Sequence, residues 1–132
     1  MIHVSEDMVK GILSYETLIA ELRNVFQSDF KMPLRHHHLY QCQDLQNTLI
    51  LMPAWNADFL GVKQVIVAPE NNKQDLNSIF ARYTLQDAKT GVPLLQMDAA
   101  YSTSFRTACA SALAASYLAP YSAQTLLIVG AG

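Results

Sequence analysis

Two basic residues of this 132-residue chain lie in segments that otherwise carry no charge, and they are the first candidates for chemistry. Lys63 lies in the run 62–67 (VKQVIV), and Arg106 lies in a stretch dominated by alanine, serine and threonine. A lone lysine in a strand is either a surface residue at the ordinary alternation or an ammonium that faces a polar pocket. In a pocket, burial lowers its pKa and a bound carboxylate opposes that shift. The strand pattern alone favours the surface residue.

Arg106 is expected in the first turn of an alanine-rich helix that begins near Ser102. The helix dipole mildly disfavours a cation there, so the placement makes sense if the guanidinium and the free backbone N–H groups face one anion. The alternative is a solvated surface arginine. Arg35, on a predicted strand, is a third cation. Because a planar carboxylate suits a bidentate guanidinium, we favour Arg106 as the direct carboxylate clamp, with Lys63 and Arg35 completing the site.

The sequence does not predict a metal site or a covalent nucleophile. Histidines 36–38 are consecutive, and adjacent residues of a strand point to opposite faces, so the three cannot bind one metal ion together. No Cys, His, Asp or Glu partner follows at a suitable spacing. Cys42 and Cys109 stand alone in dissimilar contexts, and we expect both to be reduced and structural.

Composition excludes several classes of protein. Nine basic and eleven acidic side chains give a net charge of −2 without a basic block, which argues against nucleic-acid binding. No apolar run approaches the roughly 18–20 residues of a membrane span, and the N-terminus lacks the pattern of a signal peptide. We therefore expect a globular, cytoplasmic protein.

Periodicity and turn residues predict the elements that position these side chains, and together they indicate an α+β fold. Ser5 and Ser14 are good helix N-caps, and an apolar stripe follows Ser14 at helical spacing. After residue 33, short runs rich in β-branched and aromatic residues alternate with turn residues, as in a mixed or antiparallel sheet that includes a hairpin. The predicted strands are 1–4, 35–42, 48–55, 61–68, 78–86 and 92–98, and the alanine-rich helix is 102–118.

Residues 125–129 (TLLIV) form a continuous apolar run that leads into Gly130-Ala131-Gly132. Such a run is typical of a parallel strand buried on both faces, and Gly-x-Gly after it is how a dinucleotide-binding βαβ unit opens. On local evidence alone we favour an ordinary flexible tail, and the position of this ending within the larger pattern described next reverses that preference. An apolar strand without neighbours is expected to pair with another chain, to pack back on the domain, or to promote aggregation.

Four segments, in order, resemble the ornithine cyclodeaminases, μ-crystallin and their ketimine-reductase and alanine-dehydrogenase relatives. They are PLR at 33–35; MPAW at 52–55 with LGVK at 60–63; DAKTGVPL at 87–94; and RTA at 106–108, with the alanine-rich helix after it and IVGAG at 128–132. The resemblance covers most of residues 33–132.

The resemblance implies an α+β substrate-binding and dimerisation domain over residues 1–122, followed over 123–132 by the start of a truncated Rossmann domain. It implies an NAD- or NADP-dependent enzyme acting on the Cα–N centre of a small amino or cyclic imino acid. The reaction would be ornithine to proline, or reduction of a ketimine such as pyrroline-2-carboxylate, in a homodimer without a metal. The alternative is a non-catalytic module that dimerises or binds a small carboxylate.

The resemblance also assigns roles to residues. Lys63 would contact the substrate carboxylate and help in proton handling. Arg35, Arg106, Met52 and Ser78 would bind substrate, with Trp55 as a further candidate for the pocket wall. The alternative for Met52 and Trp55 is the ordinary core, and the alternative for Ser78 and Thr103 is an ordinary strand or N-cap hydroxyl. Gly130, Gly132 and Thr103 would lie on the cofactor side. The family's catalytic aspartate, its third phosphate-loop glycine and its ribose-binding acid would lie beyond residue 132, so we expect the chain alone to be inactive and to bind no cofactor.

Overall fold

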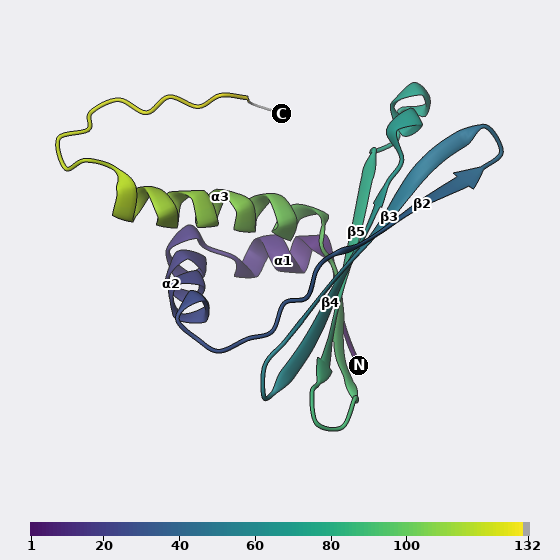
Figure 1. Ribbon diagram of the computed structural model, residues 1–132, viewed down its shortest axis with the longest axis horizontal. Coiled ribbons are helices and arrows are strands. Elements are labelled where there is room, and N and C mark those ends of the chain that lie inside the picture. The colour runs from purple at the N-terminus through teal and green to yellow at the C-terminus, as the bar shows by residue number, and fades with distance from the viewer. Residues whose placement is uncertain (131–132) are drawn as a thin grey trace.

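The computed structural model, which describes residues 1–130, is an α+β fold with one six-stranded sheet and three α-helices (Figure 1). The helices lie together on one side of the sheet. The elements are β1 (Ile2–Val4), α1 (Glu6–Ile12), α2 (Tyr15–Phe26), β2 (His36–Cys42), β3 (Leu45–Trp55), β4 (Phe59–Val67), a 3-10 turn η1 (Pro69–Gln74), β5 (Ile79–Asp87), β6 (Pro93–Asp98) and α3 (Ala100–Leu118).

The sheet has the order β1-β6-β5-β4-β3-β2. Strands β2 to β6 form an antiparallel meander, and β1 adds in parallel to β6. The mixed sheet predicted from the sequence is therefore confirmed. The predicted hairpin is β5–β6, and Gly91 takes a left-handed φ of 74° in its turn. Strand β3 begins three residues earlier than predicted, because Gln43 at φ 55° makes a tight turn that lets Leu45 pair with Cys42.

The two N-terminal helices begin where the sequence predicts. The Ser5 hydroxyl accepts a hydrogen bond from the Met8 amide at 3.3 Å, and the Ser14 hydroxyl accepts one from the Thr17 amide at 3.2 Å. The helix α3 begins at Ala100, two residues before the predicted start. Its first amide, that of Ala100, donates to the Asp98 carboxylate at 3.0 Å. The last residue of β6 therefore accepts one of the amide hydrogen bonds that have no partner within the helix.

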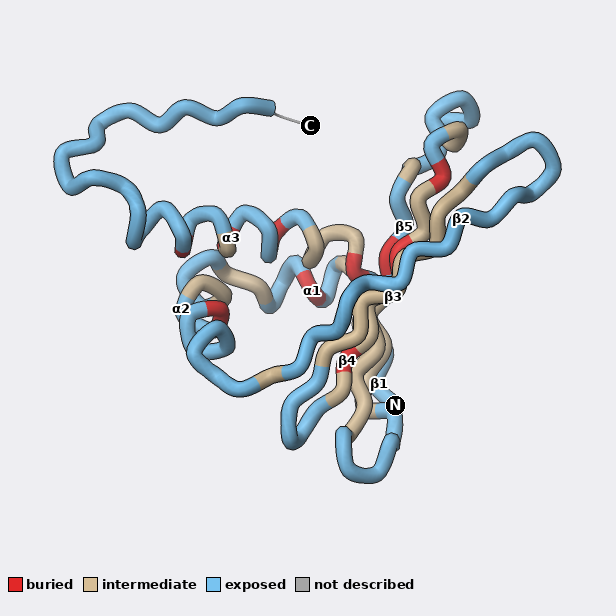
Figure 2. Tube along the Cα trace, in the orientation of Figure 1, coloured by how far each residue is buried: buried red, intermediate tan, exposed pale blue. Residues whose placement is uncertain are grey.

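Two small clusters hold the fold together. In the first, Leu22 of α2 packs against Phe105, Cys109 and Leu113 along one face of α3. In the second, Val65 and Ala81 of the sheet pack against Ala99, immediately before α3. Figure 2 shows how few positions are buried, and most of them belong to these two clusters. The helical layer therefore meets the sheet near the beginning of α3.

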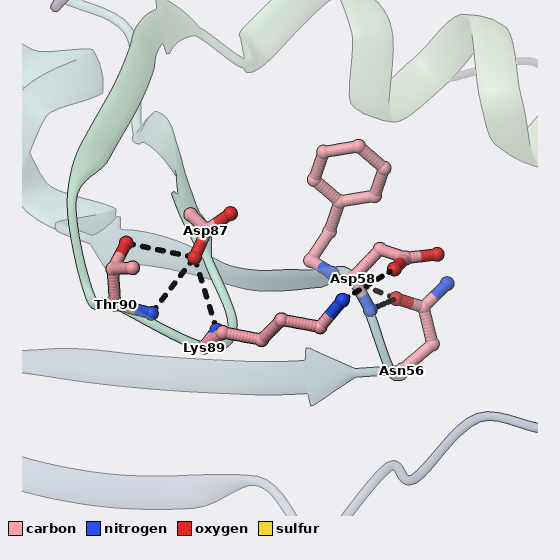
Figure 3. A network of polar contacts seen from close by, with 6 residues as sticks. Asn56, Asp58, Asp87, Lys89 and Thr90 are labelled. Atoms are coloured by element: carbon pink, nitrogen blue, oxygen red, sulfur yellow. Dashed lines mark hydrogen bonds and ion pairs between the residues drawn. The ribbon is translucent and has the colours of Figure 1, made fainter.

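The β3–β4 and β5–β6 turns lie side by side at one end of the sheet (Figure 3). One oxygen of Asp87 accepts hydrogen bonds from the Thr90 amide and hydroxyl, both at 2.7 Å, and from the Lys89 amide at 3.1 Å. The Lys89 ammonium lies 3.6 Å from Asp58, in the turn that the Asn56 side chain holds closed. The Thr90 hydrogen bonds lower the pKa of Asp87. The DAKTG segment therefore serves to shape the hairpin.

The predicted strand at 125–129 is not formed. The segment follows α3 as an extended tail without strand pairing, and Leu126 to Val129 are 71–91% exposed (Figure 2). The physical reason is that a parallel strand is stabilised only by hydrogen bonds to its neighbours, and the described residues supply none to this segment. Within residues 1–130, no helix is long and apolar enough to cross a membrane.

Candidate functional site

The pleat of the sheet divides its residues between two faces. On β4, odd-numbered residues such as Val65 face α3, and even-numbered residues face away from it. We call these the helix-side face and the open face. Lys63 is on the helix-side face, in a row of direct strand partners that runs from Met52 through Lys63 to Tyr83 and Met97. The lysine therefore points toward the helices and not toward the open face.

The surroundings of Lys63 are electropositive. The side chain is half-buried, and burial is the largest cause that lowers the pKa of Lys63. The positive charges of Arg106 and then of Arg35 lower the pKa of Lys63 further. The helix α3 and the segment before β2 thus bring both guanidinium groups within electrostatic reach of the ammonium. The three cations that the sequence singled out therefore lie near enough for the charges of Arg106 and Arg35 to act on Lys63.

Few other charges share these elements. Lys63 is the one charged residue of β3 and β4, and Arg106 is the one charged residue of α3. No carboxylate within these three elements neutralises the cluster. A bound anion would offset the repulsion among these positive charges. This region is therefore suited to bind an anion.

The placement of Arg106 corrects one sequence argument. The helix begins at Ala100, so Arg106 lies in the second turn and not the first, and the free amides of the helix start do not accompany its guanidinium. The Thr103 hydroxyl, a candidate ligand, donates to the Ala99 carbonyl at 2.5 Å. The error arose because Asp98 and Ala99 start the helix before the hydroxyl-rich segment that had suggested a cap. The charge of Arg106, not the helix terminus, supports anion binding.

Arg35 lies beside a shallow pocket of about 450 Å³. The residues that line it are Met32, Pro33, Leu34, Arg35 and His37. Met32 and Leu34 are largely exposed apolar side chains, so the pocket has an apolar rim and one cation in its wall. This space suits a small molecule that carries an apolar part and a carboxylate.

Tyr83 is a site residue that the sequence did not indicate. It is the direct strand partner of Lys63, and its ring lies over Gly61: a Cβ on this glycine would be 1.9 Å from the Tyr83 hydroxyl oxygen. Burial raises the pKa of Tyr83. The signal that could have found this contact is Gly61 itself, since glycine in a strand often marks the close approach of another group.

Other predicted site residues are placed unevenly. Met52 is the strand partner of Lys63 and packs against the cluster around Val65, as a pocket wall requires. Ser78 precedes β5, five residues from Tyr83 and so about 17 Å away along the strand, and its hydroxyl donates to the Asn72 side chain. Trp55 pairs with Lys31 in an isolated bridge at the end of β3. The structure does not bring Ser78 or Trp55 to the cations.

The remaining candidates involve glycines, histidines and cysteines. Gly130 has a left-handed φ of 95°, and Gly132 lies outside the described residues. His36 and His38 share the open face of β2 while His37 points to the other face, as predicted from alternation. No group of three or more His, Cys, Asp or Glu among residues 1–130 is arranged to hold a metal ion. Both cysteines are free, Cys42 exposed and Cys109 buried.

Comparison with known proteins identifies relatives along the whole chain. The model of the ornithine cyclodeaminase/mu-crystallin family matches residues 3–132. An uncharacterised protein of Schizosaccharomyces pombe is 42% identical across 98% of this chain and 41% of its own length. The Delta(1)-pyrroline-2-carboxylate reductase of Colwellia psychrerythraea is 33% identical across 98% of this chain and 42% of its own length.

The fold also matches a solved enzyme. The structure of Thermococcus litoralis Delta(1)-pyrroline-2-carboxylate reductase, in complex with NADH and L-proline, superposes with a TM-score of 0.77 at 29% identity. The match covers 91% of this chain and 38% of that one. The chain therefore spans about two fifths of the length of the relatives it matches.

Proposed function

The chain belongs to the ornithine cyclodeaminase/mu-crystallin family, and from this premise we propose that it is the substrate-binding and dimerising part of an NAD(P)-dependent enzyme. The enzyme would act on the Cα–N centre of a small amino or cyclic imino acid, either reducing a ketimine or converting ornithine to proline. The observation that carries this proposal is the convergence of Arg106 and Arg35 on Lys63, which lowers the pKa of the lysine. Such a cluster supports binding of the carboxylate that all these substrates share.

In this proposal each of the three cations has its own role. Arg106 clamps the carboxylate through two parallel hydrogen bonds, the geometry that a planar guanidinium favours. Lys63 contacts the same carboxylate as a point charge, and its lowered pKa lets it exchange a proton more readily than an ordinary lysine. Arg35 contributes charge from the wall of the shallow pocket. Met52 and Tyr83 flank Lys63 and supply an apolar surface for the substrate ring or chain.

Of the residues expected on the cofactor side, Gly130 and Thr103 lie among the described residues. Gly130 ends the described chain in an exposed tail, and the Thr103 hydroxyl is engaged by the Ala99 carbonyl. We therefore propose that residues outside 1–130 hold the nicotinamide cofactor, and that the 132-residue chain alone binds the carboxylate without turning it over. Steady consumption of NADH by the purified chain would contradict this.

The test is thermal unfolding of the chain with L-proline, pyrrole-2-carboxylate or NADH. A ligand at 100 times its Kd stabilises by about 2.7 kcal/mol, and at roughly 4 °C per kcal/mol the melting temperature rises by about 10 °C. Arg106→Ala removes a charge-assisted contact of about 1.5–3 kcal/mol, so at the same ligand concentration roughly 0.3–1.3 kcal/mol of stabilisation remains.

Arg82→Ala is the matched control. Arg82 is also an exposed arginine, but it lies on the open face of β5 opposite Asp98, away from Lys63. We expect a cyclic carboxylate to stabilise the wild-type and Arg82→Ala chains equally. An undiminished shift in Arg106→Ala, or a larger shift with NADH than with either carboxylate, would overturn the proposed function.

A further inference from the structure

The cations of the candidate site have no ion-pair partner within residues 1–130. In this part of the chain ion pairs are formed by four other lysines, and none of these pairs includes Arg35, Lys63 or Arg106. The acidic residue nearest to Arg35 in the sequence, Asp29, is itself paired with Lys31 at 3.7 Å. One substrate carboxylate carries one negative charge and cannot offset three positive charges. The cluster can therefore accommodate a second anionic group.

His37 is a basic residue that the proposed function does not use, and it lies on the same face of the sheet as Lys63. It is the direct strand partner of Ile50, which packs against the cluster that contacts the start of α3. The neighbouring His36 and His38 are placed on the open face by the alternation of the strand. His37 is therefore the one histidine of this run that lies on the side of the cations.

His37 and Arg35 line the same pocket of about 450 Å³. The other lining residues are Met32, Pro33 and Leu34, so the only polar side chains of the pocket are the two basic ones. Arg35 offers a planar fork of N–H donors and His37 offers a ring N–H, and both kinds of donor can bind one carboxylate. A pocket with apolar walls and a few convergent donors suits a ligand with a short apolar chain and a charged end.

The position of this pocket relative to Lys63 separates two binding places. Arg35 directly precedes β2 and Lys63 lies on β4, with β3 between the two strands. Neighbouring strands are about 4.8 Å apart, so the backbones of β2 and β4 are about 10 Å apart. The two side chains are long and extend into this gap, where the charge of Arg35 acts on Lys63. Two carboxylates joined by a short chain can therefore contact both sides of the gap, whereas a single carboxylate contacts one.

We infer that Arg35 and His37 form a second carboxylate subsite, so that the chain binds an amino or imino acid with an acidic side chain. Arg106 and Lys63 hold the α-carboxylate, and the distal carboxylate enters the pocket. The inference rests on the proposed function for the first carboxylate and specifies the class of substrate as a dicarboxylic acid. A substrate with a basic side chain would add a further positive charge to the cluster and is therefore disfavoured.

The test compares L-glutamate with L-glutamine, which have nearly the same shape but differ in the charge of the distal group. Binding of each to the full 132-residue chain is measured by titration calorimetry. Charge-assisted hydrogen bonds are roughly twice as strong as neutral ones, so we expect L-glutamate to bind at least about tenfold more tightly. His37→Ala and Arg35→Gln should each lower this ratio of Kd values to about threefold or less. The ratio compares two ligands on one variant, so a general loss of stability does not change it.

His38→Ala is the matched control. His38 is the same residue type on the same strand, but it points to the open face, so we expect this variant to keep the preference for L-glutamate. Equal Kd values in the wild type, or a preference that persists in either His37→Ala or Arg35→Gln, would overturn the inference. An equal loss of preference in His38→Ala would also overturn it. L-Proline is titrated in parallel: if it binds and L-glutamate is not preferred, the second subsite alone has failed, and if neither ligand binds, the proposed function has failed as well.

Discussion

Replacing Gly61 by alanine tests whether Tyr83 is fixed beside the cation cluster. The three atoms nearest to a Cβ at Gly61 all belong to Tyr83: the hydroxyl oxygen at 1.9 Å, Cζ at 2.6 Å and Cε2 at 3.2 Å. The ring must therefore move, although it packs against the cluster of Val65, Ala81 and Ala99. Overpacking of this kind costs about 1–3 kcal/mol, and the ordinary gain from glycine to alanine in a strand offsets roughly 0.5–1 kcal/mol.

We therefore expect Gly61→Ala to lower the free energy of unfolding by about 1 kcal/mol, and by up to about 2.5 kcal/mol, which lowers the melting temperature by about 4 °C or more. The assay is thermal and urea unfolding at fixed protein concentration, because any self-association makes stability depend on concentration. Gly11→Ala in α1 is the control. No atom lies within 4 Å of its Cβ, so this change should stabilise the protein.

A double-mutant cycle decides the mechanism. In a Tyr83→Leu background the three clashing atoms are absent, so Gly61→Ala should become neutral or stabilising. If Gly61→Ala costs the same in both backgrounds, the glycine is needed for another reason and the placement of Tyr83 over it is refuted. Because Tyr83 is the strand partner of Lys63, Gly61→Ala alone should also weaken the thermal shift caused by pyrrole-2-carboxylate.

Two further predictions concern how stability and ligand binding depend on pH. The pKa of Lys63 is lowered from 10.5 in the folded chain, so between the folded-state and unfolded-state pKa values the unfolded chain binds more protons. The stability of the unliganded chain should therefore rise with pH through this window. The affinity for a carboxylate should fall over the same window, because Lys63 loses its charge. Unfolding and ligand titrations from pH 7 to 10.5 should lose this dependence in Lys63→Gln; an unchanged dependence would count against the assignment. The folded-state pKa of Asp87 is lowered from 3.8 by its Thr90 hydrogen bonds, so its stabilisation is present above the unfolded-state pKa and is lost as pH falls through the folded value. Acid unfolding between pH 5 and 2 should be less steep in Asp87→Asn, and curves of equal slope would contradict this.

The sequence predicted elements best where local chemistry determines them. Ser5 and Ser14 cap helices because their own hydroxyls accept the first amides, and the β5–β6 turn is set by Asp87 and Gly91 within a few residues. The start of α3 was predicted too late, since it depends on a strand residue, Asp98, reaching the first helical amide. The apolar run at 125–129 was predicted as a strand, but strand formation requires partners that local sequence does not supply.

In the candidate site, too, the sequence indicates residues that stand out locally and not those placed by strand pairing. Lys63 and Arg106 could be recognised because each is the one charge in a long uncharged element. Gly61 signals a close approach, but that Tyr83 makes this approach follows from the register between β4 and β5, which no local pattern specifies. Ser78 shows the converse, since a hydroxyl in a favourable sequence context lies at the far end of the strand.

The two faces of strand β4 have different surroundings. Its odd-numbered residues, Gly61, Lys63 and Val65, form the surface beneath α3, and its even-numbered residues belong to the open face. A strand that is apolar on both faces is costly to expose, and the helices cover one of the two faces of β4. Because side chains alternate between the faces of a strand, a single charged residue on such a strand lies on one face only. Lys63 lies on the face from which the positive charges of Arg106 and Arg35 act on it. The same alternation therefore places the one charge of β4 on the helix-side face and leaves the open-face positions of β3 and β4 uncharged.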